Sequence, residues 1–500
     1  MQNPFSLSQN RTFVKFAIIF MIINAFCIYI FFNGSFFITI DNALLSSKFI
    51  LLAIGISWVS FFIGLKFLKF LSPKRLFLIF IIVRMALFIY FLLANYAIDL
   101  DLGQTWLDMV HHIINGSLFT PYSSNPSLDL WRMNPPLLMW WYTYNFFLYD
   151  LNAIGWRILN LLLEIGIFYM IITIFQEITH LKENLNENNF KVGLLFYIFS
   201  IFPIVSFILY PTIIAFPILL AQIGIYYYLK SKTSPNYLYH SILFFSLCAF
   251  TVYQAGILLI GIICLLIFQK AYKQIIFGLI EILGIFCLIS LPMLINDALG
   301  FIQRLLVIPE LETSVPNSTY WLFDQNILKI ALLLFISLVI YFYFSETIHR
   351  MKTLDFFIIL ISIMLLFSPF IYPWTFLWIL PFISISLMYN FKKYLQINII
   401  FSSYMFLYYL FFAILFLLSP IPLNPNHYDA FIQILNFGAS IGVLQLFQIF
   451  FIPIFQMGLI YIIYTLTKSK SLIFILLFPC LIFITSNFLI WLGSLVYPPF

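Results

Sequence analysis

The chain is a series of apolar runs separated by short polar connections, and most runs have the length of about 20 residues that a helix needs to cross a bilayer. The pattern therefore predicts a bundle of about 13–15 transmembrane helices. The runs lie at residues 12–33, 48–70, 76–97, 152–176, 192–210, 212–229, 237–251, 255–269, 275–295, 327–345, 354–372, 374–389, 396–418, 439–466 and 472–497.

Composition supports this interpretation. Hydrophobic residues make up 63% of the 500 residues and charged residues 8%, whereas soluble proteins average about 45–50% and about 25%. So few charges cannot cover the surface of a soluble protein of this size. A transmembrane β-barrel is excluded because its strands are short and alternate in polarity. We therefore expect an all-α, multi-pass membrane protein.

The net charge of +6 does not indicate nucleic-acid binding, because the Lys and Arg residues stand mainly at the ends of the apolar runs. Cytoplasmic loops of membrane proteins carry such an excess of basic residues. With the N-terminus in the cytoplasm, most basic residues fall on the inner side. The five cysteines lie inside apolar runs without metal-ligand spacing, so they are interpreted as small hydrophobic residues.

Three outer segments are long enough to build a site: 98–151, 296–326 and 419–438. Most of the acidic residues fall on this outer side. Two explanations stay open: the carboxylates keep the outer loops soluble, or they serve an external site.

The first outer loop, residues 98–151, has the clearest candidate chemistry. Asp99 and Asp101 directly follow a predicted span, where a positioned carboxylate can accept a proton from a hydroxyl group. Residues 103–114 have helical periodicity and predict a helix lying along the membrane interface. Trp140 and Trp141 are typical of an interfacial aromatic belt.

The order of motifs in this loop resembles the first lumenal loop of the GT-C glycosyltransferases, above all the catalytic subunit of GPI mannosyltransferase I and its prokaryotic relatives. The motifs are Asp99-Leu-Asp101, Gly116-x-x-x-x-Pro121-Tyr122 and Arg132-Met-Asn-Pro135-Pro136-Leu-Leu. Two later segments are similar to the family more loosely: Arg304 with Tyr320-Trp321, and Ser368-Pro369 through Pro381. The resemblance covers about 76–390, which would be the catalytic core, between an N-terminal two-helix hairpin (1–75) and C-terminal helices (391–500).

The resemblance implies transfer of a sugar, often mannose, from a polyprenyl-phosphate carrier to an acceptor hydroxyl on the extracytoplasmic face. Asp99 or Asp101 would orient or deprotonate that hydroxyl, and the anomeric carbon would invert. A guanidinium group matches phosphate oxygens, so Arg304 and Arg132 would hold the donor phosphate. The other expected substrate-binding residues are Tyr122, Trp321 and Asp108.

No cofactor is firmly predicted. Asp108, His111 and His112 share one helical face, but further metal ligands are not evident, so a divalent cation is left open. The expected partners are the polyprenyl-phosphate sugar, a lipid, glycan or protein acceptor, and the bilayer; a small membrane subunit is also left open. The expected location is the plasma membrane of a prokaryote or archaeon, or the endoplasmic reticulum of a eukaryote.

Two other functions remain as alternatives. Val315-Pro-Asn-Ser through Trp321 resembles the U subunit of GPI transamidase, which lacks the Asp-x-Asp pair and would make this chain a non-catalytic scaffold. A transporter or lipid flippase is the other alternative, although no clear internal repeat is present.

Charged residues within the predicted spans form a second set of candidates, because such residues are costly in a membrane. Arg157 and Glu164 lie seven residues apart on one span. They could pair with each other, pair with other spans, or line a cavity. Arg84 and Glu281 lie deeper and could be partners of one another.

Overall fold

The computed structural model describes residues 43–93, 137–138, 140–141, 153–181, 187–204, 214–252, 255–306, 353–366, 373–389, 396–397 and 443–468. Within these ranges every regular element is a helix, and no strand occurs. This confirms the all-α class that the sequence predicts. Two helical stretches, Arg157–His180 and Tyr272–Ile295, are long and apolar enough to cross a membrane.

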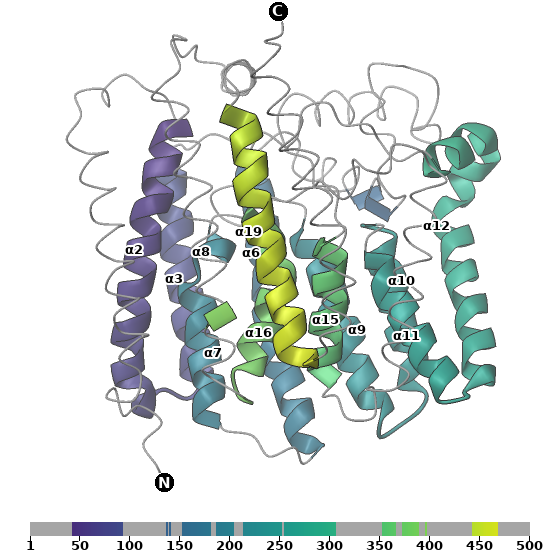
Figure 1. Ribbon diagram of the computed structural model, residues 1–500, viewed down its shortest axis with the longest axis horizontal. Coiled ribbons are helices and arrows are strands. Elements are labelled where there is room, and N and C mark those ends of the chain that lie inside the picture. The colour runs from purple at the N-terminus through teal and green to yellow at the C-terminus, as the bar shows by residue number, and fades with distance from the viewer. Residues whose placement is uncertain are drawn as a thin grey trace, which may run out of the picture.

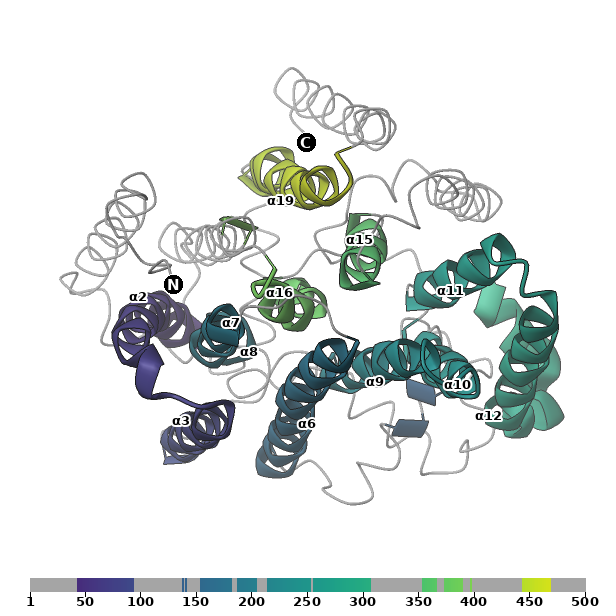
Figure 2. The ribbon, with the colours of Figure 1, turned by 90° about the horizontal axis from the view of Figure 1, so that it is seen from below.

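The helices stand side by side, most with their axes close to parallel (Figures 1 and 2). They are α2 (Ala43–Phe67), η3 (Leu68–Phe70), α3 (Pro73–Leu93), α6 (Ala153–His180), α7 (Glu187–Phe199), α8 (Ile201–Pro203), α9 (Ala215–Ser231), α10 (Tyr237–Ala249), α11 (Gly256–Phe268), α12 (Tyr272–Leu306), α15 (Thr353–Leu366), η10 (Pro373–Trp378), α16 (Leu380–Ser386) and α19 (Val443–Thr467).

The turn between α2 and α3 shows how local sequence sets a helix start. Pro73 occupies the first position of α3, where the missing N–H costs nothing. The Ser72 hydroxyl accepts the backbone N–H of Arg75 at 3.3 Å, and the Arg75 guanidinium donates to the Phe70 carbonyl at 2.7 Å. Backbone N–H and carbonyl groups at a helix end have no partner within the helix. Because the Arg75 N–H and the Phe70 carbonyl have side-chain partners, α3 can begin close to the end of α2.

The centre of the bundle consists of helices that are apolar on all sides. Nearly every residue of α15 is buried, and so is most of α7. At Gly193 of α7, an added Cβ would lie only 1.9 Å from the Ser384 carbonyl oxygen of α16. Only glycine permits so close an approach between two helix backbones, and small residues serve this purpose in membrane bundles.

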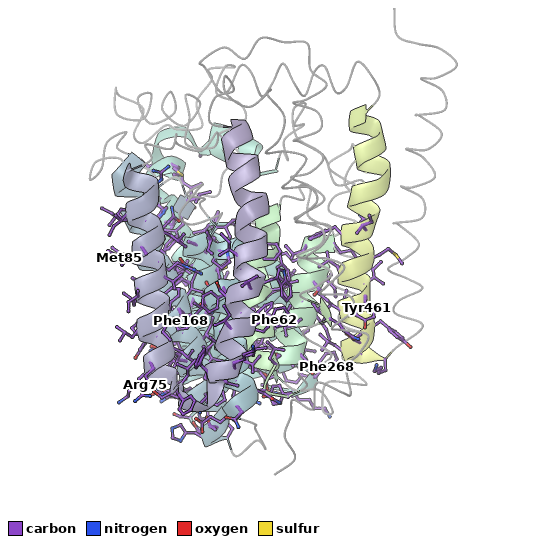
Figure 3. The ribbon with its side chains drawn as sticks, turned by 90° about the vertical axis from the view of Figure 1, so that its left-hand side faces the viewer. Phe62, Arg75, Met85, Phe168, Phe268 and Tyr461 are labelled. Carbon is purple, nitrogen blue, oxygen red and sulfur yellow. The ribbon has the colours of Figure 1, made fainter. Side chains whose placement is uncertain are left out.

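The outer helices expose large apolar side chains. Leu288 and Ile295 of α12 are 76% and 72% exposed, and Leu78 of α3 is 58% exposed. Figure 3 shows Met85 projecting outward from α3, whereas Phe168 lies inside the bundle. Faces of this kind suit lipid tails better than water.

Basic residues of the described part gather at one end of the bundle, the lower end in Figure 1, where α2, α6, α9, α11 and α19 end and α3, α7, α10, α12 and α15 begin. Arg75 marks this end in Figure 3. The opposite end receives the connection 94–152. The basic residues in question are Lys66, Lys74, Arg75, Lys191, Lys230, Lys232, Lys270, Lys273 and Lys468.

Several predicted spans agree closely with helices, among them 212–229 with α9 and 255–269 with α11. The prediction of a continuous span at 192–210 is wrong: α7 ends at Phe199, and the short α8 ends at Pro203. Proline removes a backbone donor and disfavours helical geometry in the residue before it, so the helix cannot run on through this point.

Two other boundaries need a finer description. The apolar stretch of α12 that could cross a membrane ends at Ile295, as the predicted span does, but the helix itself continues to Leu306. Figure 1 shows its last turns lying across the axis of its first part, so the added residues leave the direction of the bundle. The predicted span 374–389 starts as the 3₁₀ helix η10 before α16. The predicted spans 12–33, 327–345 and 472–497, and nearly all of 396–418, lie outside the described residues.

Candidate functional site

Most of the residues singled out from the sequence lie outside the described part of the chain. These are Asp99, Asp101, Asp108, Tyr122, Arg132 and Trp321, together with His111 and His112. Arg304 lies within α12, where the structure describes the backbone of its last turns. The described helices next to these segments in the chain are α3, α6 and α12.

Both ends of the acidic loop meet the bundle at the same end. Phe77 and Phe80 of α3 lie against Phe168 of α6, whereas Arg84, further along α3, meets Glu164, which comes earlier in α6. The two helices are thus antiparallel neighbours. The connection 94–152 leaves α3 and enters α6 at the end opposite the basic turns, with Asp99 six residues beyond Leu93, the last residue of α3.

The later part of this connection is fixed to three other helices. The Leu137 backbone N–H donates to the carbonyl oxygen of Phe250, the residue that follows α10, at 3.1 Å. The Trp140 indole N–H donates to the Ile289 carbonyl oxygen of α12, also at 3.1 Å. The Trp141 ring stacks on Phe216 of α9, with 3.9 Å between ring centroids. A hydrogen bond contributes about 0.5–1.5 kcal/mol and an aromatic pair a similar amount.

These contacts give the two tryptophans a role within the bundle. Both rings have protein partners and are half-buried. They attach the loop to the bundle, and their place in an interfacial belt stays a prediction. We call Leu137, Trp140 and Trp141 the loop anchor.

The loop anchor brings two candidate segments onto one helix. Trp140 binds Ile289 of α12, and the same helix carries Arg304 fifteen residues later, so the rise of a straight helix would separate the two by about 22 Å at most. Arg132 precedes Leu137 by five residues, a reach of about 18 Å when extended. The described end of the first outer loop and the last turns of α12 are therefore attached to the same helix.

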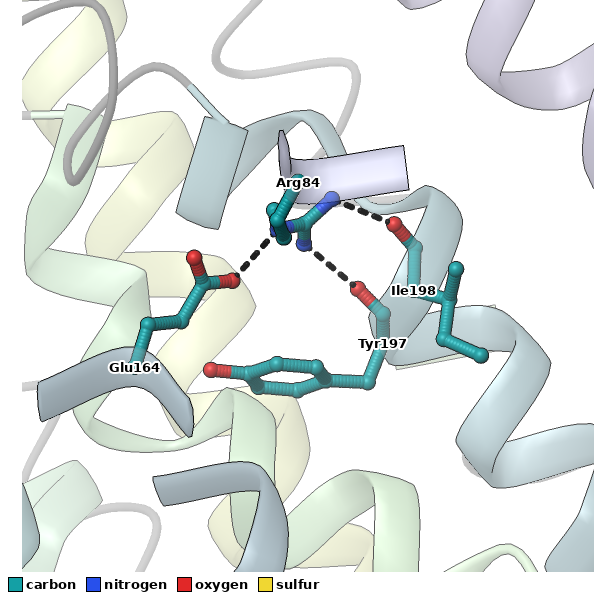
Figure 4. Close-up of polar contacts among 4 residues, drawn as sticks. All are labelled: Arg84, Glu164, Tyr197 and Ile198. Atoms are coloured by element: carbon teal, nitrogen blue, oxygen red, sulfur yellow. Dashed lines mark hydrogen bonds and ion pairs between the residues drawn. The ribbon is translucent and has the colours of Figure 1, made fainter. Parts of the chain in front are cut away.

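A buried polar junction joins α3, α6 and α7. Arg84 and Glu164 are both fully buried, and Arg84 Nε donates to Glu164 Oε1 at 2.7 Å. The other guanidinium nitrogens donate to the carbonyl oxygens of Ile198 at 2.8 Å and Tyr197 at 3.5 Å (Figure 4). The guanidinium carbon also lies 5.2 Å from the centroid of the Phe80 ring.

The junction explains how α7 can end inside the bundle. The last carbonyl groups of a helix have no partner within it and carry partial negative charge. Tyr197 and Ile198 are among the last residues of α7, and Arg84 binds their carbonyl oxygens. The suggested partnership of Arg84 with Glu281 is wrong, because Glu164 takes that place, and Glu164 pairs with another helix rather than with Arg157.

The junction is a structural element more than a substrate site. The Arg84 guanidinium already bonds one carboxylate oxygen and two carbonyl oxygens. It also lies nine residues before the end of α3, about 14 Å from it along the helix axis. The second oxygen of Glu164, Oε2, has no hydrogen-bond partner.

Other buried polar groups without partners lie elsewhere in the bundle. The side-chain amide of Gln222 in α9 is fully buried with both of its polar atoms unbonded, and Oε2 of Glu281 in α12 is buried without a partner. Among the described residues, no group of three or more His, Cys, Asp or Glu side chains could hold a metal ion.

Sequence reasoning missed the loop anchor, because the acceptor of the Trp140 indole N–H on α12 is a backbone carbonyl oxygen, which no side chain marks in the sequence. The comparisons with protein-family models, curated proteins and solved structures found no match for this chain.

Proposed function

We propose that the protein is a multi-pass membrane glycosyltransferase. It moves a sugar, with mannose the first candidate, from a polyprenyl-phosphate carrier to an acceptor hydroxyl on the extracytoplasmic face. Support comes from the Asp99-Leu-Asp101 pair and the motifs that follow it, which resemble the first lumenal loop of the GT-C enzymes. The proposed location is the plasma membrane of a prokaryote or archaeon, or the endoplasmic reticulum of a eukaryote.

The proposed fold is a GT-C-like bundle of about 13–15 spans. The apolar outer faces of α3 and α12 support a membrane setting, since they would meet lipid tails. The clustering of basic turns at one end supports an orientation with that end in the cytoplasm and the acidic loop outside.

The observation that carries the proposal is the shared end of the bundle. The connection with the aspartate pair leaves α3 at the end opposite the basic turns, and its later part is fixed to α12, the helix of Arg304. A lipid-linked donor would bring its phosphate to the membrane surface at this same end. The general base and a phosphate-binding arginine would therefore face one substrate complex.

The proposed reaction is a single displacement at the anomeric carbon. The acceptor oxygen forms the new bond to that carbon while its proton passes to Asp99 or Asp101. The bond between the anomeric carbon and the phosphate oxygen breaks, and the polyprenyl phosphate leaves with the electron pair. Arg304 and Arg132 would stabilise the charge on this leaving group.

A transfer assay tests the proposal. Membranes containing the protein are incubated with labelled polyprenyl-phosphate mannose and a membrane extract that supplies acceptors. We expect label to move into product. Asp99→Asn and Asp101→Asn keep the side-chain size but remove the base, and at least one of them should lower the rate by about 10²- to 10⁴-fold.

Two outcomes would contradict the proposal. No transfer above that of membranes without the protein, with several polyprenyl-phosphate sugars, would remove the activity. Full activity in both aspartate variants would remove the catalytic assignment. Stable co-purification with a second membrane protein, together with tolerance of both substitutions, would instead support the scaffold alternative.

A further inference from the structure

The helix α12 lies at the edge of the bundle (Figures 1 and 2). In the described part of the chain, its outward side is exposed and apolar. Ile276, Ile280 and Leu283, at helical spacing, are 59%, 60% and 62% exposed. On the inward side, a Cβ added at Gly278 would lie 2.7 Å from the Ile242 side chain of α10. One side of α12 therefore packs on the bundle, and the other would meet the membrane interior.

Two lysines stand at the start of this apolar surface. Lys270 lies in the turn between α11 and α12, and Lys273 is the second residue of α12. Both residues are exposed, and neither forms an ion pair with another described residue. Ile276 and Ile280 follow Lys273 by three and seven residues, so they share its side of the helix. Along this side of α12, basic groups are therefore followed directly by apolar side chains.

The basic residues of this end outnumber its acidic residues. In the described part of the chain, nine Lys and Arg residues lie here together with three acidic ones, Glu177, Glu187 and Asp355. Between residues 188 and 280 the chain has five lysines and no Asp or Glu. The start of α12 therefore presents an excess of positive charge, which suits the anionic lipids of a cytoplasmic membrane surface.

The backbone of Lys270 has a conformation that is costly for lysine. Its φ is 57°, in the left-handed region that glycine adopts readily and other residues rarely adopt. The Lys270 N–H donates to the Ile267 carbonyl oxygen and the Ala271 N–H to the Leu266 carbonyl oxygen, both at 2.9 Å. This pattern usually closes a helix with glycine at the position of Lys270. A lysine kept there at a cost in stability favours a role for its side chain.

We propose that an anionic phospholipid of the cytoplasmic leaflet binds at the start of α12. Its phosphate binds Lys270 and Lys273, and its acyl chains lie along Ile276, Ile280 and Leu283. The rise from Lys273 to Leu283 is about 15 Å, which matches one leaflet of a hydrocarbon core about 30 Å thick. The surface thus fits a phospholipid in both charge and length. The inference needs the membrane setting and orientation proposed above, but not the sugar transfer.

The experiment uses the full-length protein purified in a neutral detergent. Its melting temperature is measured during titration with phosphatidylglycerol, and with phosphatidylcholine of the same acyl chains as the neutral comparison. A ligand that binds only the folded state raises the melting temperature, so we expect a larger rise with the anionic lipid. In Lys270→Gly and in Lys273→Gln, the phosphatidylglycerol concentration at half of the maximal shift should increase about fivefold, and in the double variant about 25-fold.

Two measurements separate lipid binding from folding. Without lipid, Lys270→Gly should melt at the same temperature as the original protein or higher, since glycine suits the φ of this position. Lys468→Gly is the matched control, because Lys468 at the end of α19 is also exposed and also has a left-handed φ, 58°. This variant loses the same charge and should keep the full lipid response.

Equal shifts with both lipids, or an unchanged response in the double variant, would overturn the inference. An equal loss of response in Lys468→Gly would do so too, because it would make the effect one of total charge. Inorganic phosphate that reproduces the whole shift would rule out the lipid as the ligand. A protein that transfers no sugar but keeps the lipid response would remove the proposed function and leave this inference standing.

Discussion

At the scale of single residues, the Arg84 side chain has the most demanding environment in the described part of the chain. It is fully buried, yet it bonds one carboxylate and two carbonyl groups that come from two other helices. Burying two charges is costly, and only good geometry with additional hydrogen bonds compensates for it. Removing one partner leaves the other charge buried and alone.

This asymmetry gives a stability prediction. Glu164→Leu leaves Arg84 without its carboxylate and should lower the free energy of unfolding by about 3–5 kcal/mol. The double variant Arg84→Leu/Glu164→Leu removes both charges and should be less destabilised than Glu164→Leu alone. Thermal unfolding of the detergent-solubilised proteins measures both. A double variant that loses as much as the sum of the two single variants would show that Arg84 and Glu164 are not coupled, and would contradict the ion pair as described.

At the scale of elements, the packing of α7 against α16 depends on a single glycine. An added methyl group at Gly193 would overlap the Ser384 carbonyl oxygen, a backbone atom that cannot rotate away. The helices would have to separate along their buried contact. At Gly284 of α12, in contrast, no atom lies within 4 Å of an added Cβ.

We therefore expect alanine at the two glycine positions to have opposite effects on thermal stability. Gly193→Ala should lower the melting temperature by several degrees or prevent folding. Gly284→Ala should be neutral or stabilise by up to about 1 kcal/mol, because alanine favours helix more than glycine does. Thermal scanning of both variants in the same detergent gives the comparison. Equal melting temperatures would mean that α7 and α16 do not meet as closely as described.

Comparison of the predicted spans with the helices shows which elements the sequence alone can predict. The predicted spans at 212–229 and 255–269 agree with α9 and α11, because an apolar run bounded by polar turns marks a helix directly. The break after Phe199 was not predicted, since hydropathy stays high there and the cap comes from Arg84, far away in sequence. The loop anchor escaped prediction because its acceptor, a carbonyl near Pro292, has no side-chain signature.

At the scale of the whole molecule, the described helices form a bundle with two unlike ends. One end carries the basic turns, and the other receives the connection with Asp99 and Asp101. The motif order and the placement of both candidate segments on the outer side could be read from the sequence, whereas the contact of Trp140 with α12 needed the structure. The proposed reaction requires the acidic loop to face the side where the lipid-linked sugar is presented.

Labelling of introduced cysteines on intact cells tests this requirement most directly. Ser123→Cys lies in the acidic loop, and Ser234→Cys lies in the turn between α9 and α10 at the basic end. A membrane-impermeant maleimide is added before or after permeabilisation, and the labelled peptide is identified. We predict that residue 123 is labelled in intact cells and residue 234 only after permeabilisation. The reverse pattern would place the aspartate pair in the cytosol and contradict the proposed external transferase.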